Sequence, residues 1–324
     1  MNPKIEKLAE ENGVLSFELS NVNVSFANGI RRVMLSEIDS VVFRTFPHQE
    51  NKANFIKNTT RFTNEILKQR LSCIPVHLPT DAPIKDLSIE VNVKNNTDEI
   101  VYVTTKDFKI KQKTSGTILS ESQQHKIFPA NPMSKDYILF AKLRPGIGGN
   151  GEELHFTADF DIGNGKENGM FSAASISTFS NTLDPIKIAS AWKEEERKIT
   201  TENEMSKQDL ELYRLNWMLL DGQRHFKDNS FDFKVESVGV YSNESLVIKA
   251  CDVMIGKIND LYKKCDTQTL KIKKSQTTIE NSYDITLENE SYSLGKTIEF
   301  ILYNNFYINE KVLSYCGFKK FHPH

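Results

Sequence analysis

The sequence predicts an α+β fold on two observations. Over residues 15–19 and 283–287, apolar residues alternate with polar ones as in a half-buried strand, and the spacing then changes to that of an amphipathic helix. Between these units, residues 78–160 hold short runs of β-forming residues separated by turn-rich stretches. We therefore expect two strand–helix units and an inserted, mostly antiparallel β module.

The two strand–helix units are predicted to be copies of one another. The first helix is expected to begin at Ser25, a suitable N-cap, and a shift of 268 residues lays Ser293 on Ser25 with strand, cap and apolar face coinciding. Because one strand with one amphipathic helix cannot bury its apolar face alone, we expect the helices to pack together as an intramolecular pseudo-dimer. The predicted interface comprises Phe26, Ile30, Val33, Met34, Leu294, Ile298, Ile301 and Leu302. In the alternative arrangement, each apolar face packs against its own local sheet.

The same patterns predict the other elements. Residues 63–71 are expected to form a helix that ends before Ile74 and Pro75, because proline disfavours the helical conformation in its predecessor. The highly charged stretch 191–209 is expected to face solvent. Further elements are expected beyond Ser206 through residues 211–222, ending near Gly222 (helix), at residues 231–235 (strand) and at residues 244–264 (helix).

Composition limits the possible classes of function. The chain has 324 residues, 39% apolar and 26% charged, so it can bury a core without disulfides. Its net charge of −2 argues against a protein that coats nucleic-acid phosphates, and we expect little direct nucleic-acid contact. No apolar stretch approaches a membrane span and the first residues form no apolar leader, so neither membrane insertion nor secretion is expected.

No catalytic, cofactor or metal site is predicted. The four cysteines lie far apart in the sequence, and the seven histidines lack spaced carboxylate and nucleophile partners. Gly146 to Gly151 fit the GxGxxG pattern of dinucleotide sites. Such a site needs a helix directly after the glycines, whereas residues 151–160 are typical of a strand. A loop between strands is therefore expected here.

Three segments resemble one family, in the family's order. FELSNVNVSFANGIRRVMLSEI, residues 17–38, is similar to the first helix region of the third-largest subunit of eukaryotic RNA polymerase II, its archaeal D-type equivalent and the bacterial alpha N-terminal domain. Residues 60–76 resemble the family's second helix with its Ile-Pro ending, and residues 231–239 resemble its last strand. The matching residues are Asn28, Ile30, Arg31, Arg32, Ser36, Glu37, Glu65, Arg70, Leu71, Ile74, Pro75, Val235, Glu236, Ser237 and Gly239.

The C-terminal segment resembles the small partner protein of this family, archaeal L and its eukaryotic equivalent. Residues 287–302 are similar to its strand-to-helix junction through Glu290, Leu294 and Gly295. Residues 312–324 resemble its closing stretch of glycine, an aromatic residue, histidine and proline. With both partners on one chain, the sequence resembles the fused D-plus-L subunit of RNA polymerases from large eukaryotic DNA viruses.

The resemblance implies alpha/D-L-like dimerisation domains that serve as a noncatalytic platform, docking the two large polymerase subunits and small subunits. Arg31 and Arg32, which point off the apolar face, are then candidates for contacts with a large subunit; otherwise they are solvated helix arginines. The implied segments are residues 1–78 (dimerisation domain, first part), 79–165 (inserted β module), 166–265 (dimerisation domain, second part) and 266–324 (L-like unit).

The resemblance also bears on metal binding and location. Some relatives carry a cysteine cluster for zinc or iron–sulfur in the inserted domain, but this chain has no cysteine between Cys73 and Cys251, so we expect no metal there. The expected location is intracellular, in the cytoplasm or nucleus of a host cell or packaged in the virion. The alternative function is a freestanding interaction or virion structural protein with the same dimerisation fold.

Overall fold

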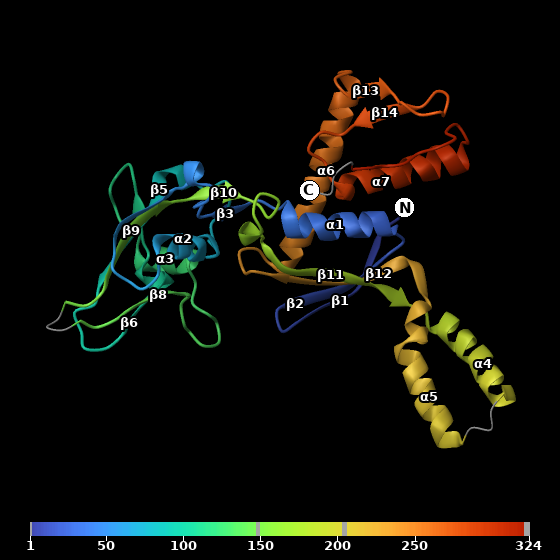
Figure 1. The fold of residues 1–324 in the computed structure, drawn as a ribbon, viewed down its shortest axis with the longest axis horizontal. Coiled ribbons are helices and arrows are strands. Elements are labelled where there is room, and N and C mark those ends of the chain that lie inside the picture. Colours follow the sequence, from blue (N-terminus) through green and yellow to red (C-terminus); the bar gives the residue numbers. More distant parts are fainter. Residues whose placement is uncertain (1, 147–149, 203–205, 321–324) are drawn as a thin grey trace. The chain divides into compact units, whose positions relative to one another are not determined.

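The chain forms two compact units, each assembled from separate stretches of sequence. The first unit comprises Met1–Arg32, Ile176–Glu236 and Met254–His324, and the second comprises Val33–Ser175 and Ser237–Val253. The computed structural model (Figure 1) describes residues 2–146, 150–202 and 206–320.

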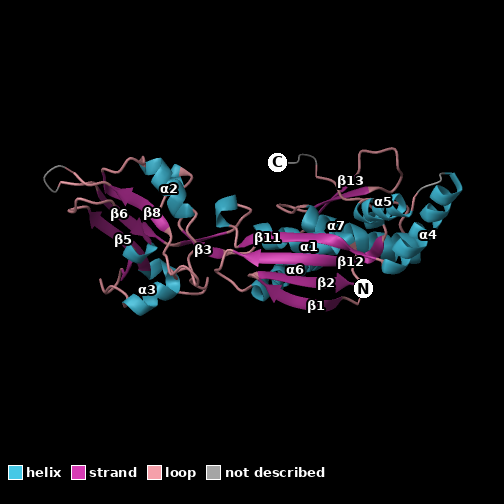
Figure 2. Ribbon diagram, turned by 90° about the horizontal axis from the view of Figure 1, so that it is seen from below, coloured by secondary structure: helices cyan, strands magenta, loops and turns pink. Residues whose placement is uncertain are grey.

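The first unit contains a four-stranded sheet in the order β1–β2–β12–β11, with β1 and β12 both antiparallel to β2 (Figure 2). Its strands are β1 (Lys4–Glu11), β2 (Val14–Ser20), β11 (Ala174–Leu183) and β12 (Phe226–Ser237). The predicted alternation is confirmed in β2, where Leu15, Phe17 and Leu19 are buried. Phe17 pairs with Phe233 of β12, and their rings stack with centroids 5.1 Å apart. Aromatic burial on one face therefore fixes the register of these strands.

Three helices correspond to the predicted apolar faces. They are α1 (Val24–Ser36), α6 (Asn243–Asp266) and α7 (Tyr292–Leu302). The expected caps are wrong: Asn23 Oδ1 accepts the hydrogen bond from the Ser25 backbone N at 2.9 Å, and Ser291 caps α7. Helices α1 and α7 nevertheless begin 268 residues apart, which is the shift predicted between the two strand–helix segments.

Most described charged side chains at residues 191–209 are exposed, as expected, but Trp192 and Ile199 of the same stretch are buried. The stretch lies in a helical hairpin of α4 (Pro185–Glu202) and α5 (Lys207–Leu219), which lie side by side in Figure 1. The hairpin has its own aromatic core, in which the rings of buried Trp192 and Trp217 have centroids 5.4 Å apart. Tyr213 donates a hydrogen bond from its hydroxyl to Glu195 Oε1 at 3.1 Å.

The C-terminal part of the first unit begins with a short hairpin. Strand β13 (Lys271–Lys274) pairs antiparallel with β14 (Tyr283–Thr286), and every residue of both strands is exposed. The strand predicted there therefore forms, but it does not have the half-buried face that the alternation implied. Helix α7 follows β14 and continues into a π-helical stretch, Tyr303–Asn309.

The second unit contains antiparallel sheets and short helices. One antiparallel sheet has the order β4–β9–β5–β7, and two-stranded sheets pair β6 with β8 and β3 with β10. These strands are β3 (Ser40–Val42), β4 (Ala53–Asn58), β5 (Leu87–Lys94), β6 (Val101–Thr104), β7 (Lys109–Gln112), β8 (Leu139–Leu143), β9 (Glu153–Asp159) and β10 (Asp161–Gly163). The strand expected after the GxGxxG glycines is β9; residues 147–149 of that motif lie outside the described residues.

The core of the second unit is rich in phenylalanine. Phe108 contacts the rings of Phe128, Phe140 and Phe156 edge-on, with centroids 5.5–5.9 Å apart. Two helices complete this unit: α2 (Asn64–Ser72), close to the predicted 63–71, and α3 (Glu121–Ile127). Short 3-10 turns lie at His48–Glu50, Ile84–Asp86, Thr105–Asp107, Gly169–Phe171 and, in the first unit, Asp221–Arg224. Among the described helices, none has the length and apolar character needed to cross a membrane.

Candidate functional site

Helices α1 and α7 lie next to each other in Figure 1. Within the first unit, Gly29 of α1 comes close to α7. A Cβ atom placed on Gly29 would lie 3.1 Å from the Ser293 backbone O, 3.3 Å from Thr297 Oγ1 and 3.7 Å from Met254 Cε. Helix α1 therefore lies close to α7 and to Met254 of α6 at Gly29. A larger side chain at this position must displace a neighbour. A glycine inside an amphipathic helix is a sequence signal for such close packing.

Polar contacts surround this helix crossing. Arg32 donates from Nε to Ser293 Oγ at 3.3 Å, and Thr297 Oγ1 donates to the Ser293 backbone O at 2.9 Å. On the α6 side, Lys257 Nζ lies 2.8 Å from Glu290 Oε2 in an ion pair that is mostly buried. The contacts connect α1 and α6 to the first turns of α7 and to the residue just before its cap.

The structure places the predicted interface residues in different environments. Ile30, Val33, Met34 and Leu294 are buried, but Val33 and Met34 belong to the second unit. Phe26, Ile298 and Leu302 are half-buried, whereas Ile301 is exposed. The residues of α7 that are buried are Ser293, Leu294, Gly295 and Thr297. Leu294 is thus the one large apolar side chain buried in α7, and its burial contributes about 2 kcal/mol.

Arg31 and Arg32 are half-buried, with intramolecular contacts. Arg31 donates from Nε to Asn28 Oδ1 at 2.9 Å, and its backbone O accepts a hydrogen bond from Ser177 Oγ at 3.1 Å. Burial, together with the neighbouring Arg32 charge, lowers the pKa of Arg31. Arg32 contacts Ser293 of α7, as described above. This contact does not test the predicted contact of Arg32 with a large polymerase subunit. The contact with a large subunit stays a prediction.

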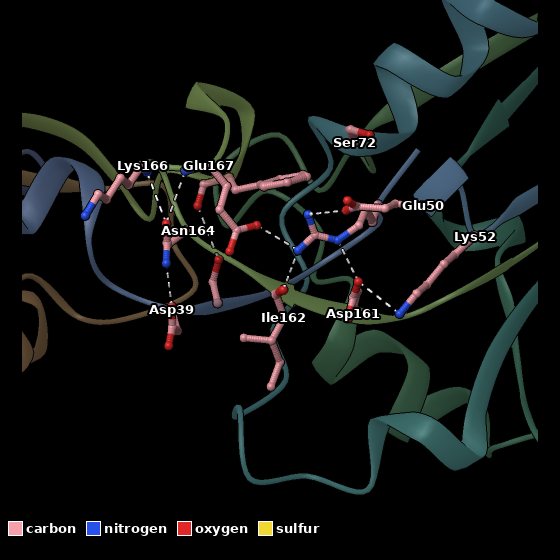
Figure 3. A network of polar contacts seen from close by, with 12 residues as sticks. Asp39, Glu50, Lys52, Ser72, Asp161, Ile162, Asn164, Lys166 and Glu167 are labelled. Atoms are coloured by element: carbon pink, nitrogen blue, oxygen red, sulfur yellow. Dashed lines mark hydrogen bonds and ion pairs between the residues drawn. The ribbon is translucent and has the colours of Figure 1, made fainter. Parts of the chain in front are cut away.

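A second polar cluster, in the second unit, centres on Arg44. Figure 3 labels its partners Glu50, Asp161, Ile162 and Glu167. Arg44 donates from Nε to Asp161 Oδ2 at 2.6 Å and from Nη2 to Glu167 Oε2 at 2.7 Å and to the Ile162 backbone O at 2.8 Å. Lys52 Nζ also lies 2.9 Å from Asp161 Oδ2. Partial burial opposes ionisation of Asp161, but hydrogen bonds from Lys52 and Arg44 outweigh it and lower the pKa of this carboxyl. The charges are mutually compensated, which suits a structural clamp on β10 better than a catalytic group.

The described residues include no group of three or more histidine, cysteine, aspartate or glutamate side chains placed to hold a metal ion. The cysteines among them are free: Cys73 and Cys265 are exposed, and Cys251 and Cys316 are half-buried. Burial raises the pKa of the Cys251 thiol, which disfavours the reactive thiolate. The contacts described at this site are helix packing, hydrogen bonds and ion pairs.

Comparisons with known proteins agree with this emphasis on packing. The family model for the RNA polymerase Rpb3/Rpb11 dimerisation domain matches residues 16–258. The subunit RPAC1 of DNA-directed RNA polymerases I and III from Saccharomyces cerevisiae is 28% identical over 54% of this chain and 57% of its own length.

Two other relatives match more of the chain. Subunit 3B of DNA-directed RNA polymerases IV and V from Arabidopsis thaliana is 25% identical over 79% of this chain and 88% of its own. Subunit Rpo3 of the Methanosarcina acetivorans DNA-directed RNA polymerase is 26% identical over 81% of this chain and 97% of its own. With three quarters of its length inside the family model, this chain belongs to the RNA polymerase Rpb3/Rpb11 dimerisation-domain family.

Proposed function

We propose that this chain is a noncatalytic assembly-platform subunit of a multisubunit DNA-directed RNA polymerase and unites the D-like and L-like dimerisation partners. Membership of the dimerisation-domain family supports this proposal. The relatives from yeast, a plant and an archaeon are all subunits of DNA-directed RNA polymerases. The fused arrangement, of the kind found in large eukaryotic DNA viruses, is the more specific part of the proposal.

The observation that carries the fusion is the close approach of α1 and α7 at Gly29. Helix α1 comes from the D-like segment and α7 from the L-like segment, and the two begin 268 residues apart, each after a strand. Helix-to-helix packing between the copies is what an intramolecular pseudo-dimer requires. Packing of α7 only against its own hairpin would leave the space beside Gly29 open.

The proposed partners are the two large polymerase subunits and small polymerase subunits. Arg31 and Arg32 are the proposed contacts with a large subunit, because a guanidinium can bind a carboxylate in a bidentate manner. The net charge of −2 supports a platform for proteins, since no overall attraction to nucleic acid is needed. The proposed location is the cytoplasm or nucleus of an infected cell, or the virion.

Co-purification tests this function. A tagged full-length chain, recovered at low salt from cells that make the polymerase, is expected to bring down both large subunits. Gly29→Leu, which crowds the α1–α7 crossing, is expected to reduce their yield, while Gly256→Ala on the open surface of α6 serves as the matched control. Recovery of the chain without any large subunit would contradict the proposal and favour a freestanding interaction or virion structural protein.

A further inference from the structure

The ion pair between Lys257 and Glu290 differs from the other charged contacts of the C-terminal segment. Its Nζ–Oε2 distance is 2.8 Å, and only 16% of the Lys257 side chain and 20% of the Glu290 side chain are exposed. In the hairpin next to it, Lys271 and Glu288 also pair, but their side chains are 63% and 51% exposed. Water screens an exposed pair, whereas a mostly buried charge depends on its partner.

Both partners stand at positions that control helix placement. Lys257 lies one turn after buried Met254, on the inner face of α6. Glu290 immediately precedes Ser291, the cap of α7. A bond between Lys257 and Glu290 therefore fixes where α7 begins relative to α6.

The fully buried part of the α7 contact holds a single large apolar side chain, while Ile298, Phe300 and Leu302 are half-buried. Of the buried residues of α7, Ser293, Gly295 and Thr297 are small or polar, and Leu294 is the exception. One leucine can slide along an apolar helix surface, whereas an ion pair holds only at one register. Polar contacts at the start of α7 therefore add a constraint on register that the apolar contacts lack.

We propose that Lys257 and Glu290 are the positioning residues that select and orient the L-like helix α7 on the D-like helix α6. This inference rests on the proposed function, because it assigns a role within the pseudo-dimer. A helix without an acid at this position lacks the carboxylate that lies 2.8 Å from the mostly buried Lys257 ammonium, so the pair favours α7 over such a helix. The hydrogen bond from Arg32 to Ser293 acts one turn further along and reinforces the same register.

Neighbouring charges are more exposed. Asp260, one turn after Lys257, pairs with Lys263 at 3.6 Å, and its side chain is 72% exposed. Lys257 and Glu290 line a cavity of about 310 Å³ together with Lys264, Lys271 and Glu288. Because the neighbouring groups are more open to water, exchanging the charges of Lys257 and Glu290 is expected to preserve most of their mutual attraction.

Charge exchange in the full-length chain tests the proposal, with hydrogen–deuterium exchange of the α7 amides as readout. Lys257→Glu and Glu290→Lys are each expected to speed amide exchange in α7 about tenfold or more, because each places two like charges together. The combined variant Lys257→Glu/Glu290→Lys is expected to return exchange to within about threefold of the original protein. Lys271→Glu and Glu288→Lys are the matched controls, with an expected change below about twofold.

A second variant series protects the test against misfolding of the charge reversals. Lys257→Met leaves Glu290 without its ammonium partner, and adding Glu290→Gln is expected to restore the protection of α7. No effect of the single reversals, or a double variant as poorly protected as the singles in either series, would overturn the proposal. If the exchange results hold but the original protein recovers no large polymerase subunit, the positioning role stands and the proposed function fails.

Discussion

At the residue scale, the most consequential single charge is Glu18, which is buried within the four-stranded sheet. Lys7 Nζ lies 2.7 Å from Glu18 Oε2, and Ser230 Oγ donates to Glu18 Oε1 at 2.7 Å. These hydrogen bonds from Lys7 and Ser230 outweigh the cost of burial and lower the pKa of Glu18 to about 2. The ionised carboxylate thereby links β1, β2 and β12 at neutral pH.

This arrangement predicts a specific loss of stability in acid. The folded pKa of Glu18 lies below the ordinary value of 4.5, so its contribution is fully present above about pH 5 and is lost as the pH falls toward 2. Glu18→Gln is expected to lower the free energy of unfolding by about 1–3 kcal/mol at pH 7. The difference from the original protein should shrink between pH 5 and pH 2.5, as measured by denaturant unfolding. A constant difference across that range, or an equal effect of the control Glu288→Gln, would contradict it.

Two helical glycines give opposite predictions because their surroundings differ. Gly256 of α6 has no neighbour within 4 Å of a Cβ placed on it, so Gly256→Ala should raise the free energy of unfolding by up to about 1 kcal/mol. A Cβ placed on Gly29 would lie 3.1 Å from the Ser293 backbone O, so Gly29→Leu should lower the free energy of unfolding by about 2–3 kcal/mol. Thermal unfolding of both variants measures these opposite changes in stability. An equal response at the two positions would mean that α1 and α7 do not approach each other closely.

At the scale of elements, the sequence predicts segments whose periodicity is strong and misses those that depend on pairing. Apolar spacing predicts that α1, α6 and α7 are helices, but the buried face of α7 differs from the predicted one, because Ile301 is exposed and Ser293 and Thr297 are buried. Strand β1 could have been predicted from the Asn12-Gly13 pair, which is typical of a hairpin turn. In the structure both residues have positive φ, at 52° and 80°, as a type I′ turn requires. Helix α4 was hidden by its charges, although Trp192 and Ile199, seven residues apart, mark its buried face. The short strands β3 and β10 have three residues each, too few to show any period.

The two apolar helix faces are not equally buried, and this predicts unequal mutational effects. Ile30 of α1 is only 4% exposed, so Ile30→Asp buries a charge without a partner and should cost about 4 kcal/mol of stability or more. Ile298 of α7 is half-buried, so the aspartate at that position can reach water and should cost about 1–2 kcal/mol. Denaturant unfolding of both variants measures the difference. A larger cost at Ile298 would show that α7 provides the more deeply buried face.

At the scale of the whole molecule, family membership could be predicted from motifs in family order, but the contacts at the site could not. Lys257 and Glu290 are separated by 33 residues, and Arg32 and Ser293 by 261. No local pattern links residues so far apart, because their pairing depends on how α1, α6 and α7 pack. The repeat predicted that α1 and α7 could pack together. It did not identify Gly29, where the two helices come close, although Gly29 is next to the predicted interface residue Ile30.

Recruitment of a large polymerase subunit can be separated from packing by comparing two adjacent arginines. Arg31 bonds within α1 to Asn28, so Arg31→Ala should leave the α7 amides protected and lower large-subunit recovery severalfold if this guanidinium binds a partner. Arg32 also bonds to Ser293, so Arg32→Ala should affect both readouts, with faster α7 exchange and reduced recovery. Hydrogen exchange of the isolated chain and co-purification from the same cells measure the two effects. Unchanged recovery with both alanines would place the two arginines outside the docking surface, because loss of a bidentate contact must weaken an interface that uses it.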